Sequence, residues 1–360
     1  MRSAVRSPRL LFVASLAASA VARGDTPRPL PGPAPQQRVE GFDAAAANLT
    51  CEGCHSAIAA EWRGSLHHRA WDDPVFLTAY AIEPLAFCRG CHVPEADPAR
   101  LPSEGARRLG VGCVTCHVQG AEVVGAHAMA AKPGAHPVFA DARQATSAAC
   151  ERCHQFEFPT PQRAPMQGTA DEHRDSRHAA EACQSCHMAP VQSDAGRPHR
   201  SHDFRVLGNV ERLRSAVTAR AARTGRSAVS ISLTAARIGH AFPTGDMFRR
   251  LEVRARLLDA RGAVVAVASP VALARRFVMS HGQRLQVGDD RVPASGEARE
   301  IELAFDEPLA GRAVRWEVAY QRLEASMAKA FGVDAAAEEV LVAEGTLLST
   351  KPSKPARARP

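Results

Sequence analysis

The sequence predicts an α+β protein with two unlike parts: short helices and loops over residues 47–204, then an antiparallel β-sandwich-like domain over residues 205–350. All ten cysteines of the 360 residues lie in the first part, in boxes that recur every 25 to 37 residues. The second part has no cysteine, and its apolar residues alternate with polar ones, as in half-buried strands. The segments at the two ends of the chain show neither pattern.

The amino terminus has the composition of a signal peptide. Arg2, Arg6 and Arg9 precede an apolar run, Leu10 to Ala22, that ends in the small-residue cleavage pattern Ala20-Val-Ala22. The run is short for a bilayer span, and no later stretch is long and apolar enough to be one. Residues 1–22 are therefore predicted to be a Sec-type signal peptide of an exported, periplasmic protein that is not transmembrane. A retained amino-terminal anchor is the alternative.

Residues 23–46 are predicted to be a proline-rich linker. Five prolines fall between Pro27 and Gln37 among few apolar residues, and this composition favours an extended chain. At the other end of the chain, residues 351–360 combine lysines and arginines with prolines. This segment is predicted to be a basic disordered tail.

Every cysteine belongs to one of five C-x-x-C-H boxes. Two thiols at this spacing add to the two vinyl groups of one haem, and the following histidine becomes an axial ligand of its iron. Paired disulfides or zinc knuckles, the alternatives, do not require a histidine after every second cysteine. The sequence therefore predicts five covalently bound haem c groups. Their thiols are those of Cys51, Cys54, Cys88, Cys91, Cys113, Cys116, Cys150, Cys153, Cys183 and Cys186, and their proximal iron ligands are His55, His92, His117, His154 and His187.

The composition fits a first part whose core is haem. Phe, Trp and Tyr make up only 5% of the chain, and porphyrins would supply the large apolar surfaces that these side chains usually provide. The formal charge of +7 does not indicate a nucleic-acid partner. The signal peptide carries three of the arginines, and each ferric haem with ionised propionates adds about −1, which leaves an overall charge of about −1.

Several motifs give the first part a resemblance to a known family. They are Glu61-Trp-Arg-Gly-Ser-Leu-His67, Gly110-Val-Gly-Cys-Val-Thr-Cys-His117, Ser176-Arg-His178, Cys183-Gln-Ser-Cys-His-Met188 and His199-Arg-Ser-His202-Asp-Phe204. With the first box, they resemble the cytochrome c-554/c-prime family of multihaem cytochromes over residues 47–204. The resemblance implies periplasmic electron transfer, in several members around nitrogen or metal respiration, and haems that mostly have two histidine ligands. The fifth box and the carboxy-terminal domain depart from the tetrahaem members.

Ten histidines lie outside the boxes, and five of them would complete two-histidine ligation. His67 and His178 share a Ser-x-His pattern and match distal-ligand positions of the family that the chain resembles. His127 and His136 are alternatives for one site, and His202 is favoured over His199. His68, His173 and His281 are expected at the surface. The candidate distal ligands are therefore His67, His127, His136, His178, His202 and His240.

His240 is a candidate because of its surroundings in the second part. It lies in Gly239-His-Ala-Phe-Pro-Thr-Gly245, which resembles a motif in sandwich-like domains appended to other bacterial multihaem cytochromes. The glycines allow a close approach of the backbone, and the proline fixes a turn. Such a rigid loop could donate a ligand across the boundary between the two parts; a turn histidine bonded within its own loop is the alternative.

The second part is predicted to contain strands over 229–233, 251–257, 300–305 and 314–320, with a hairpin turn at Asp259-Ala-Arg-Gly262. Short helical pieces are expected over 324–331 and 335–340. About 145 residues can bury a core of their own, which favours a separate domain. Two adjacent arginine pairs, at 249–250 and 275–276, either meet haem propionates or are exposed charges on strand edges.

The predicted function is electron transfer by a pentahaem cytochrome between respiratory redox partner proteins, whose identities the sequence does not give. The alternative is an oxidoreductase with one open haem site that acts on a small nitrogen or sulfur compound. The lysine box C-x-x-C-K of pentahaem nitrite reductases is absent, and only Tyr80 and Tyr320 could replace the tyrosine of hydroxylamine-oxidising enzymes. These observations favour a carrier over an enzyme. A third possibility is that the sandwich domain binds a partner or ligand through its end loops.

Overall fold

The computed structural model describes residues 38–158, 165–192 and 198–349. The predicted signal peptide and basic tail lie outside these residues. Helix α1 (Ala44–Cys54) begins where Asp43 accepts a hydrogen bond from the Ala46 amide, a typical N-cap. The last residues of the predicted 23–46 linker are therefore helical. Among the described residues, no helix is both long and apolar enough to cross a membrane.

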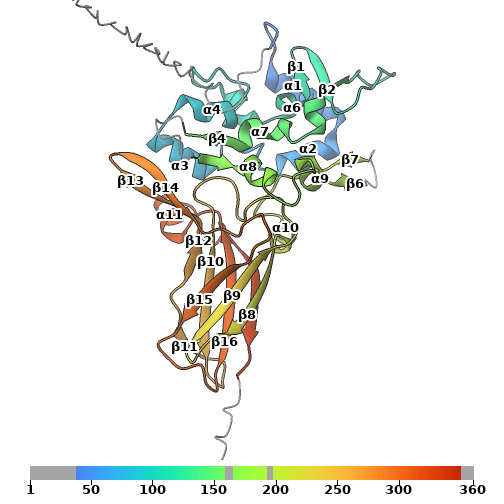
Figure 1. The fold of residues 1–360 in the computed structure, drawn as a ribbon. Helices are drawn as coiled ribbons and strands as arrows, with labels where there is room; N and C mark the ends of the chain where they lie inside the picture. The colour runs from blue at the N-terminus through green and yellow to red at the C-terminus, as the bar shows by residue number, and fades with distance from the viewer. Residues whose placement is uncertain (1–37, 159–164, 193–197, 350–360) are drawn as a thin grey trace, which may run out of the picture. The chain divides into compact units, whose positions relative to one another are not determined.

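The first part consists of short helices and small two- or three-stranded sheets (Figure 1). After α1 come α2 (Ser56–Arg63), α3 (Pro74–Ile82), α4 (Ala86–His92), α5 (Glu104–Leu109), α6 (Cys113–His117), α7 (Ala148–His154), α8 (Thr169–Arg174), α9 (Cys183–His187) and the 3-10 turn η1 (Ala142–Ala145). The strands are β1 (Val118–Gln119), β2 (Glu122–Gly125), β3 (Phe139–Ala140), β4 (Gln155–Glu157), β5 (Pro165–Gly168), β6 (Pro190–Val191) and β7 (His199–Arg200). Strands of two to four residues are too short to show alternation, so the sequence did not predict them.

Protein side chains supply little core in the first part. In the described residues, the apolar cluster within it contains Trp62, Leu109, Val114 and Val118 as its buried members. The Trp62 indole also donates a hydrogen bond of 2.8 Å to the Val111 carbonyl. A segment of this length with so small a core needs another apolar component to order it.

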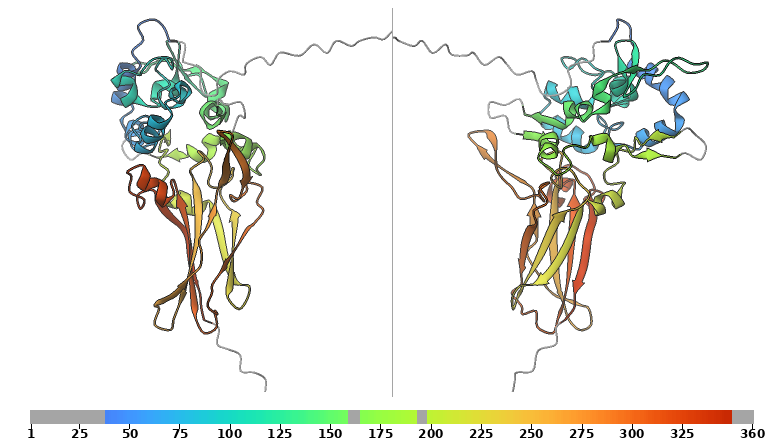
Figure 2. Two further views of the ribbon diagram at one scale, coloured as in Figure 1. Left: turned by 90° about the vertical axis from the view of Figure 1, so that its left-hand side faces the viewer. Right: turned by 45° about the vertical axis from the view of Figure 1, so that its right-hand side comes forward.

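The second part is a two-sheet antiparallel sandwich (Figures 1 and 2). One sheet has the strand order β11-β10-β16-β17, with β12 also paired to β10, and the other has the order β15-β9-β8. The bounds are β8 (Val217–Arg223), β9 (Ala228–Ala235), β10 (Arg250–Leu258), β11 (Val264–Val267), β12 (Val271–Leu273), β15 (Arg299–Ala304), β16 (Ala313–Gln321) and β17 (Glu339–Leu347), with helices α10 (Val210–Ser215) and α11 (Ala325–Ala330).

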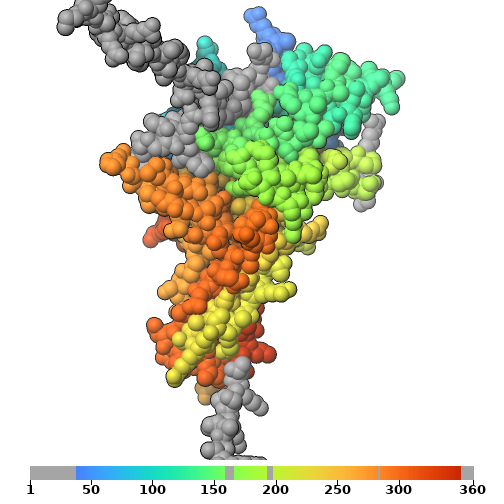
Figure 3. Space-filling view, viewed as in Figure 1, coloured from blue at the N-terminus to red at the C-terminus, as the bar shows by residue number. Residues whose placement is uncertain are grey.

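The sandwich has a continuous core between its sheets. Alternate residues of β9 and β10 are buried, and Ile231, Leu233, Leu251 and Leu257 are fully buried in one cluster to which β16 also contributes. Strands β13 (Arg275–Ser280) and β14 (Gln283–Asp289) pair as a separate hairpin, whose residues are drawn in orange in Figure 3. The predicted α+β class, helical first and antiparallel second, is confirmed.

The periodicity located four strands correctly, but one predicted helix is wrong. The Asp259 to Gly262 turn does close a hairpin, with the Asp259 amide donating to the Ala263 carbonyl at 2.9 Å. The stretch 335–340 forms no helix. It is a turn whose Ala336 amide is bonded by the Asp334 carboxylate, and Val340 already pairs with Tyr320 in the sheet. Pairing along β16 therefore overrides the helix propensity of the alanines.

The helical part and the sandwich belong to one compact unit and share buried polar contacts. Arg322, at the end of β16, binds both carboxylate oxygens of Asp73 at 2.7 Å. Thr244 and Thr169 are hydrogen-bonded through their hydroxyls at 2.8 Å. These contacts tie the loops of the sandwich to α3 and α8.

Candidate haem-binding sites

The five boxes lie at the ends of short helices or form such helices themselves. They end α1, α4 and α7 and constitute α6 and α9. Positions i, i+3 and i+4 share one face of a helix, so the two thiols and the histidine of a box point to the same side. All ten thiols, each within the described residues, are free of disulfides. The local geometry is therefore the one that thioether attachment to one macrocycle requires.

Three box histidines have their Nδ1 atoms fixed by hydrogen bonds. Nδ1 of His92 lies against the Ala70 carbonyl and that of His117 against the Val124 carbonyl, while Nδ1 of His154 faces Oε1 of Gln167 at 3.1 Å. Since these oxygens only accept, each Nδ1 must carry the proton. The Nε2 atom of each ring then remains available to bind iron.

Four box histidines each face a second imidazole from elsewhere in the chain. The ring centroids are 6.2 Å apart in every pair: His55 with His136, His67 with His154, His117 with His202 and His187 with His240. Of the six distal candidates, four thus stand opposite a box, and His136 rather than His127 occupies the position opposite His55.

The common spacing fits one metal ion between two imidazoles. Imidazole nitrogen lies about 2.0 Å from a bound transition metal and about 1.1 Å from its ring centre, so two rings on one iron have centroids about 6.2 Å apart. The residues present therefore fit haem iron with two histidine ligands at four boxes.

The remaining candidates, His127 and His178, do not stand opposite a box histidine in the described structure, so their role as ligands stays a prediction. Nδ1 of His178 lies 2.7 Å from Oε1 of Glu181, and His127 is exposed. His199, over which His202 is favoured, lies 3.1 Å from a carboxylate oxygen of Glu61.

His92 differs from the other four box histidines. Its ring stacks on Phe76 with centroids 3.6 Å apart and planes at 9°. Phe76 in turn lies beside Trp71 and Tyr80, and the Tyr80 hydroxyl accepts a hydrogen bond from Arg89. Within the described residues, no second imidazole faces His92, so the second box lacks the two-histidine arrangement.

Burial keeps five of the eight facing imidazoles neutral. It lowers the pKa of His67 to about 3 and the pKa values of His187 and His240 to about 4. Burial also lowers the pKa values of His154 and His202. Neutral imidazole is the form that binds a metal, so these rings can act as ligands at neutral pH without losing a proton.

Neighbouring boxes touch through their thiols. The Cys91 and Cys153 thiols are hydrogen-bonded, and this contact, together with burial, raises the pKa of Cys91 well above its usual value. Cys150 forms the same kind of contact with Cys183 and has a raised pKa for the same reasons. Because the box sulfurs would attach directly to the macrocycle, contact between two boxes would bring two haem edges together. The fourth box is thus adjacent to both the second and the fifth.

The arginine pairs are not all exposed strand-edge charges. Arg249 donates to Asp246 and to the Tyr320 hydroxyl, both at 3.0 Å, and Arg275 donates to the backbone carbonyls of Met166 and Gly245. For these two, the strand-edge interpretation is wrong. Arg250 pairs with Glu252 and Glu324, and only Arg276, with 60% of its side chain exposed, fits that interpretation.

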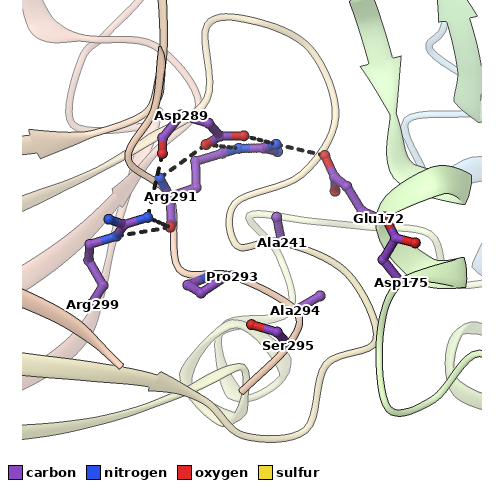
Figure 4. Close-up of a pocket in the computed structure, with 9 residues that line it drawn as sticks. All are labelled: Glu172, Asp175, Ala241, Asp289, Arg291, Pro293, Ala294, Ser295 and Arg299. Atoms are coloured by element: carbon purple, nitrogen blue, oxygen red, sulfur yellow. Dashed lines mark hydrogen bonds and ion pairs between the residues drawn. The ribbon is translucent and has the colours of Figure 1, made fainter. Parts of the chain in front are cut away.

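The loop that carries His240 borders a pocket of about 310 Å³ (Figure 4). Arg291 crosses its edge and binds both Asp289 and Glu172, the latter from α8. Arg299 donates to the Arg291 carbonyl at 3.1 Å. Sequence reasoning missed Glu172 and Arg291, because single charged residues in a polar stretch give no periodic or motif signal.

Comparison with known proteins agrees with this geometry. Residues 50–118 match the family model described as cytochrome c554 and c-prime. This segment is therefore similar to a cytochrome c554/c-prime family domain. Together with the five repeated boxes, the match indicates a multihaem c-type cytochrome.

The fold of nearly the whole chain also has a solved counterpart. The penta-heme cytochrome c552 from Thermochromatium tepidum is similar with a TM-score of 0.66 and 22% identity, over 82% of this chain and 97% of that chain. At this identity, the match demonstrates the shared fold alone. It does extend the likeness from the cytochrome domain into the sandwich. No curated protein sequence matches the chain.

Proposed function

We propose that the protein is an exported pentahaem c-type cytochrome that moves electrons between respiratory redox partners in the periplasm. The observation that carries the proposal is the common 6.2 Å spacing of four imidazole pairs, each containing a box histidine. The signal-like amino terminus supports export, since haem is attached to C-x-x-C-H boxes outside the cytoplasm. The similar fold of a penta-heme cytochrome supports a count of five.

Haem iron would supply reversible one-electron chemistry, and this chain's residues would hold it. The proposed distal ligands are His136 at the first box, His202 at the third, His67 at the fourth and His240 at the fifth. Paired imidazoles keep an iron six-coordinate in both oxidation states, so little rearrangement accompanies electron transfer. The hydrogen bonds at Nδ1 fix ring orientation and raise ligand basicity.

The contacts between boxes support a branched route for electrons. The fourth box touches the second through Cys91 and Cys153 and the fifth through Cys150 and Cys183. The Cys116 thiol also interacts electrostatically with Cys153, which places the third box close to the fourth. The haem at the fourth box would therefore be the junction between the haems at the second, third and fifth boxes.

A second candidate function rests on the second box. Because Phe76 rather than an imidazole is the ring nearest to His92, an iron there could keep an exchangeable sixth position. Such a site would allow reaction with a small nitrogen or sulfur compound. Tyr80 lies 5.5 Å from Phe76 between ring centroids and is the tyrosine available on that side.

Reduction and reoxidation of the purified holoprotein test the carrier proposal. The reduced protein should be reoxidised completely and reversibly by a generic electron acceptor. It should be unaffected by nitrite, hydroxylamine or sulfite on the same timescale. Multiple-turnover conversion of any of these compounds would favour the oxidoreductase over the electron carrier. Irreversible reoxidation would contradict electron transfer as the role.

A further inference from the structure

The loop of His240 is fixed at several points besides its own turn. The Phe242 amide donates to the Val292 carbonyl at 2.9 Å, and the Val292 amide donates back at 3.0 Å. A Cβ atom at Gly239 would lie 3.1 Å from side-chain atoms of both His173 and His178, so the loop packs closely on the helical part. Gly245 has a φ of 108°, which other residues rarely adopt.

Two arginines join this loop to the cytochrome part: Arg275 through the Met166 and Gly245 carbonyls, and Arg291 through Glu172. Arg291 is 6% exposed, and it donates a hydrogen bond of 3.0 Å to the carbonyl of Pro243, a residue of the loop. The same guanidinium donates 2.7 Å to Oε1 of Glu172 in α8, and its Nε donates 2.9 Å to Asp289. A planar guanidinium can hold several acceptors at fixed angles, which an ammonium group cannot.

Glu172 is bound to the loop on its other oxygen as well. Oε2 of Glu172 accepts a hydrogen bond of 2.6 Å from the Thr244 hydroxyl, next to Pro243. The Thr244 hydroxyl is also bonded to Thr169 at the start of α8. Two consecutive loop residues are thus tied to one carboxylate, and that carboxylate belongs to the short helix preceding the fifth box.

We propose that the Arg291–Glu172 ion pair positions His240 for ligation at the fifth box. The inference rests on the proposed ligation by His240 and adds two residues that do not themselves touch the metal. The His187 and His240 rings, with centroids 6.2 Å apart and planes at 18°, come from different parts of the chain. Their spacing therefore depends on how the loop is held against α8, and a loosened loop would leave the iron with one imidazole.

The matched control is Arg322, another buried arginine between the same two parts. It has 7% of its side chain exposed and binds Asp73 at 2.7 Å, and its side-chain bonds within the described residues reach Asp73 and Glu338 rather than residues 239–245. Arg291→Met and Arg322→Met each remove one buried guanidinium of similar exposure. Any general weakening of the interface should affect both variants.

The experiment is paramagnetic resonance of the ferric holoprotein, with optical detection of carbon monoxide binding after reduction. Arg291→Met should convert one haem per molecule from low spin to high spin, and that haem should gain carbon monoxide binding. Arg322→Met should leave the number of low-spin haems unchanged. Arg291→Lys, which keeps a bond to Glu172, should restore part of the low-spin signal, and Glu172→Gln should reproduce part of the loss if Arg291→Met fails to mature.

The His240→Ala variant separates this inference from the ligand assignment. If that variant gains one high-spin haem while Arg291→Met and Glu172→Gln keep the wild-type number of low-spin haems, His240 is a ligand but the ion pair does not position it. An equal loss in Arg291→Met and Arg322→Met also overturns the inference, because the interface alone would then explain it. If His240→Ala itself keeps every low-spin haem, the proposed ligation fails and this inference with it.

Discussion

The ring centroids of His187 and His240 lie 6.2 Å apart. His187 ends a C-x-x-C-H helix, and His240 lies in a loop of the β-sandwich. We expect His240→Ala to turn one low-spin haem high-spin, because its iron would lose the imidazole opposite His187. The midpoint potential of that haem should rise while the others stay unchanged. Free imidazole added to the variant should restore the low-spin signal; a spin state identical to that of the wild type would leave the loop with a structural role.

The first box offers a choice between two histidines of one hairpin. Both side chains are exposed, but His136 faces His55, whereas His127 faces no box histidine within the described residues. We expect His136→Ala to create one high-spin haem and His127→Ala to leave the spectrum unchanged. Paramagnetic resonance of the two ferric variants checks this, and the reverse result would show that the hairpin is arranged differently around haem.

The second box should behave differently from the others before any mutation. Since Phe76 stacks on His92 and no imidazole faces it in the described residues, one haem of the wild-type protein should bind carbon monoxide when reduced. Replacing both Cys88 and Cys91 by serine should remove that fraction together with one haem. Carbon monoxide binding that survives the double replacement would assign the open position to another box.

The sequence predicted the chemistry of the boxes better than it predicted which histidine faces each box. The boxes are local, since a helical turn brings i, i+3 and i+4 together wherever it occurs. The partners are set by long-range packing, so spacing alone could not separate His127 from His136. The Arg291–Glu172 ion pair joins two charged residues far apart in the sequence, and no motif or periodicity predicts it.

The sandwich was predictable where both its faces are well defined. Strands β9 and β10 alternate cleanly because one face is buried in the shared core and the other faces outward. Strand β11 was missed because three of its four residues are exposed valines, which give no alternation. Register, strand order and the β13–β14 hairpin depend on pairing between strands and could not be read from one strand at a time.

The core of the sandwich should be stable without haem. We expect residues 205–350, expressed alone, to unfold cooperatively, because their apolar cluster does not include the boxes. Ile231→Ala should lower the free energy of unfolding by about 2 to 5 kcal/mol, since Ile231 is fully buried between the sheets. Denaturant unfolding of the parent fragment and of its Ile231→Ala variant checks this. Val265→Ala, at an exposed position, is the matched control. Lack of a cooperative transition in the parent fragment would place the domain boundary elsewhere.

The number of haems covalently attached to the mature protein tests the central claim most directly. Mass spectrometry of the denatured holoprotein, combined with haem quantification after acid-acetone extraction, gives that number independently of spin state or activity. The account predicts five haems that resist extraction, and four in a variant that lacks the cysteines of any one box. A count below four in fully matured protein, or zinc in place of haem iron, would contradict it.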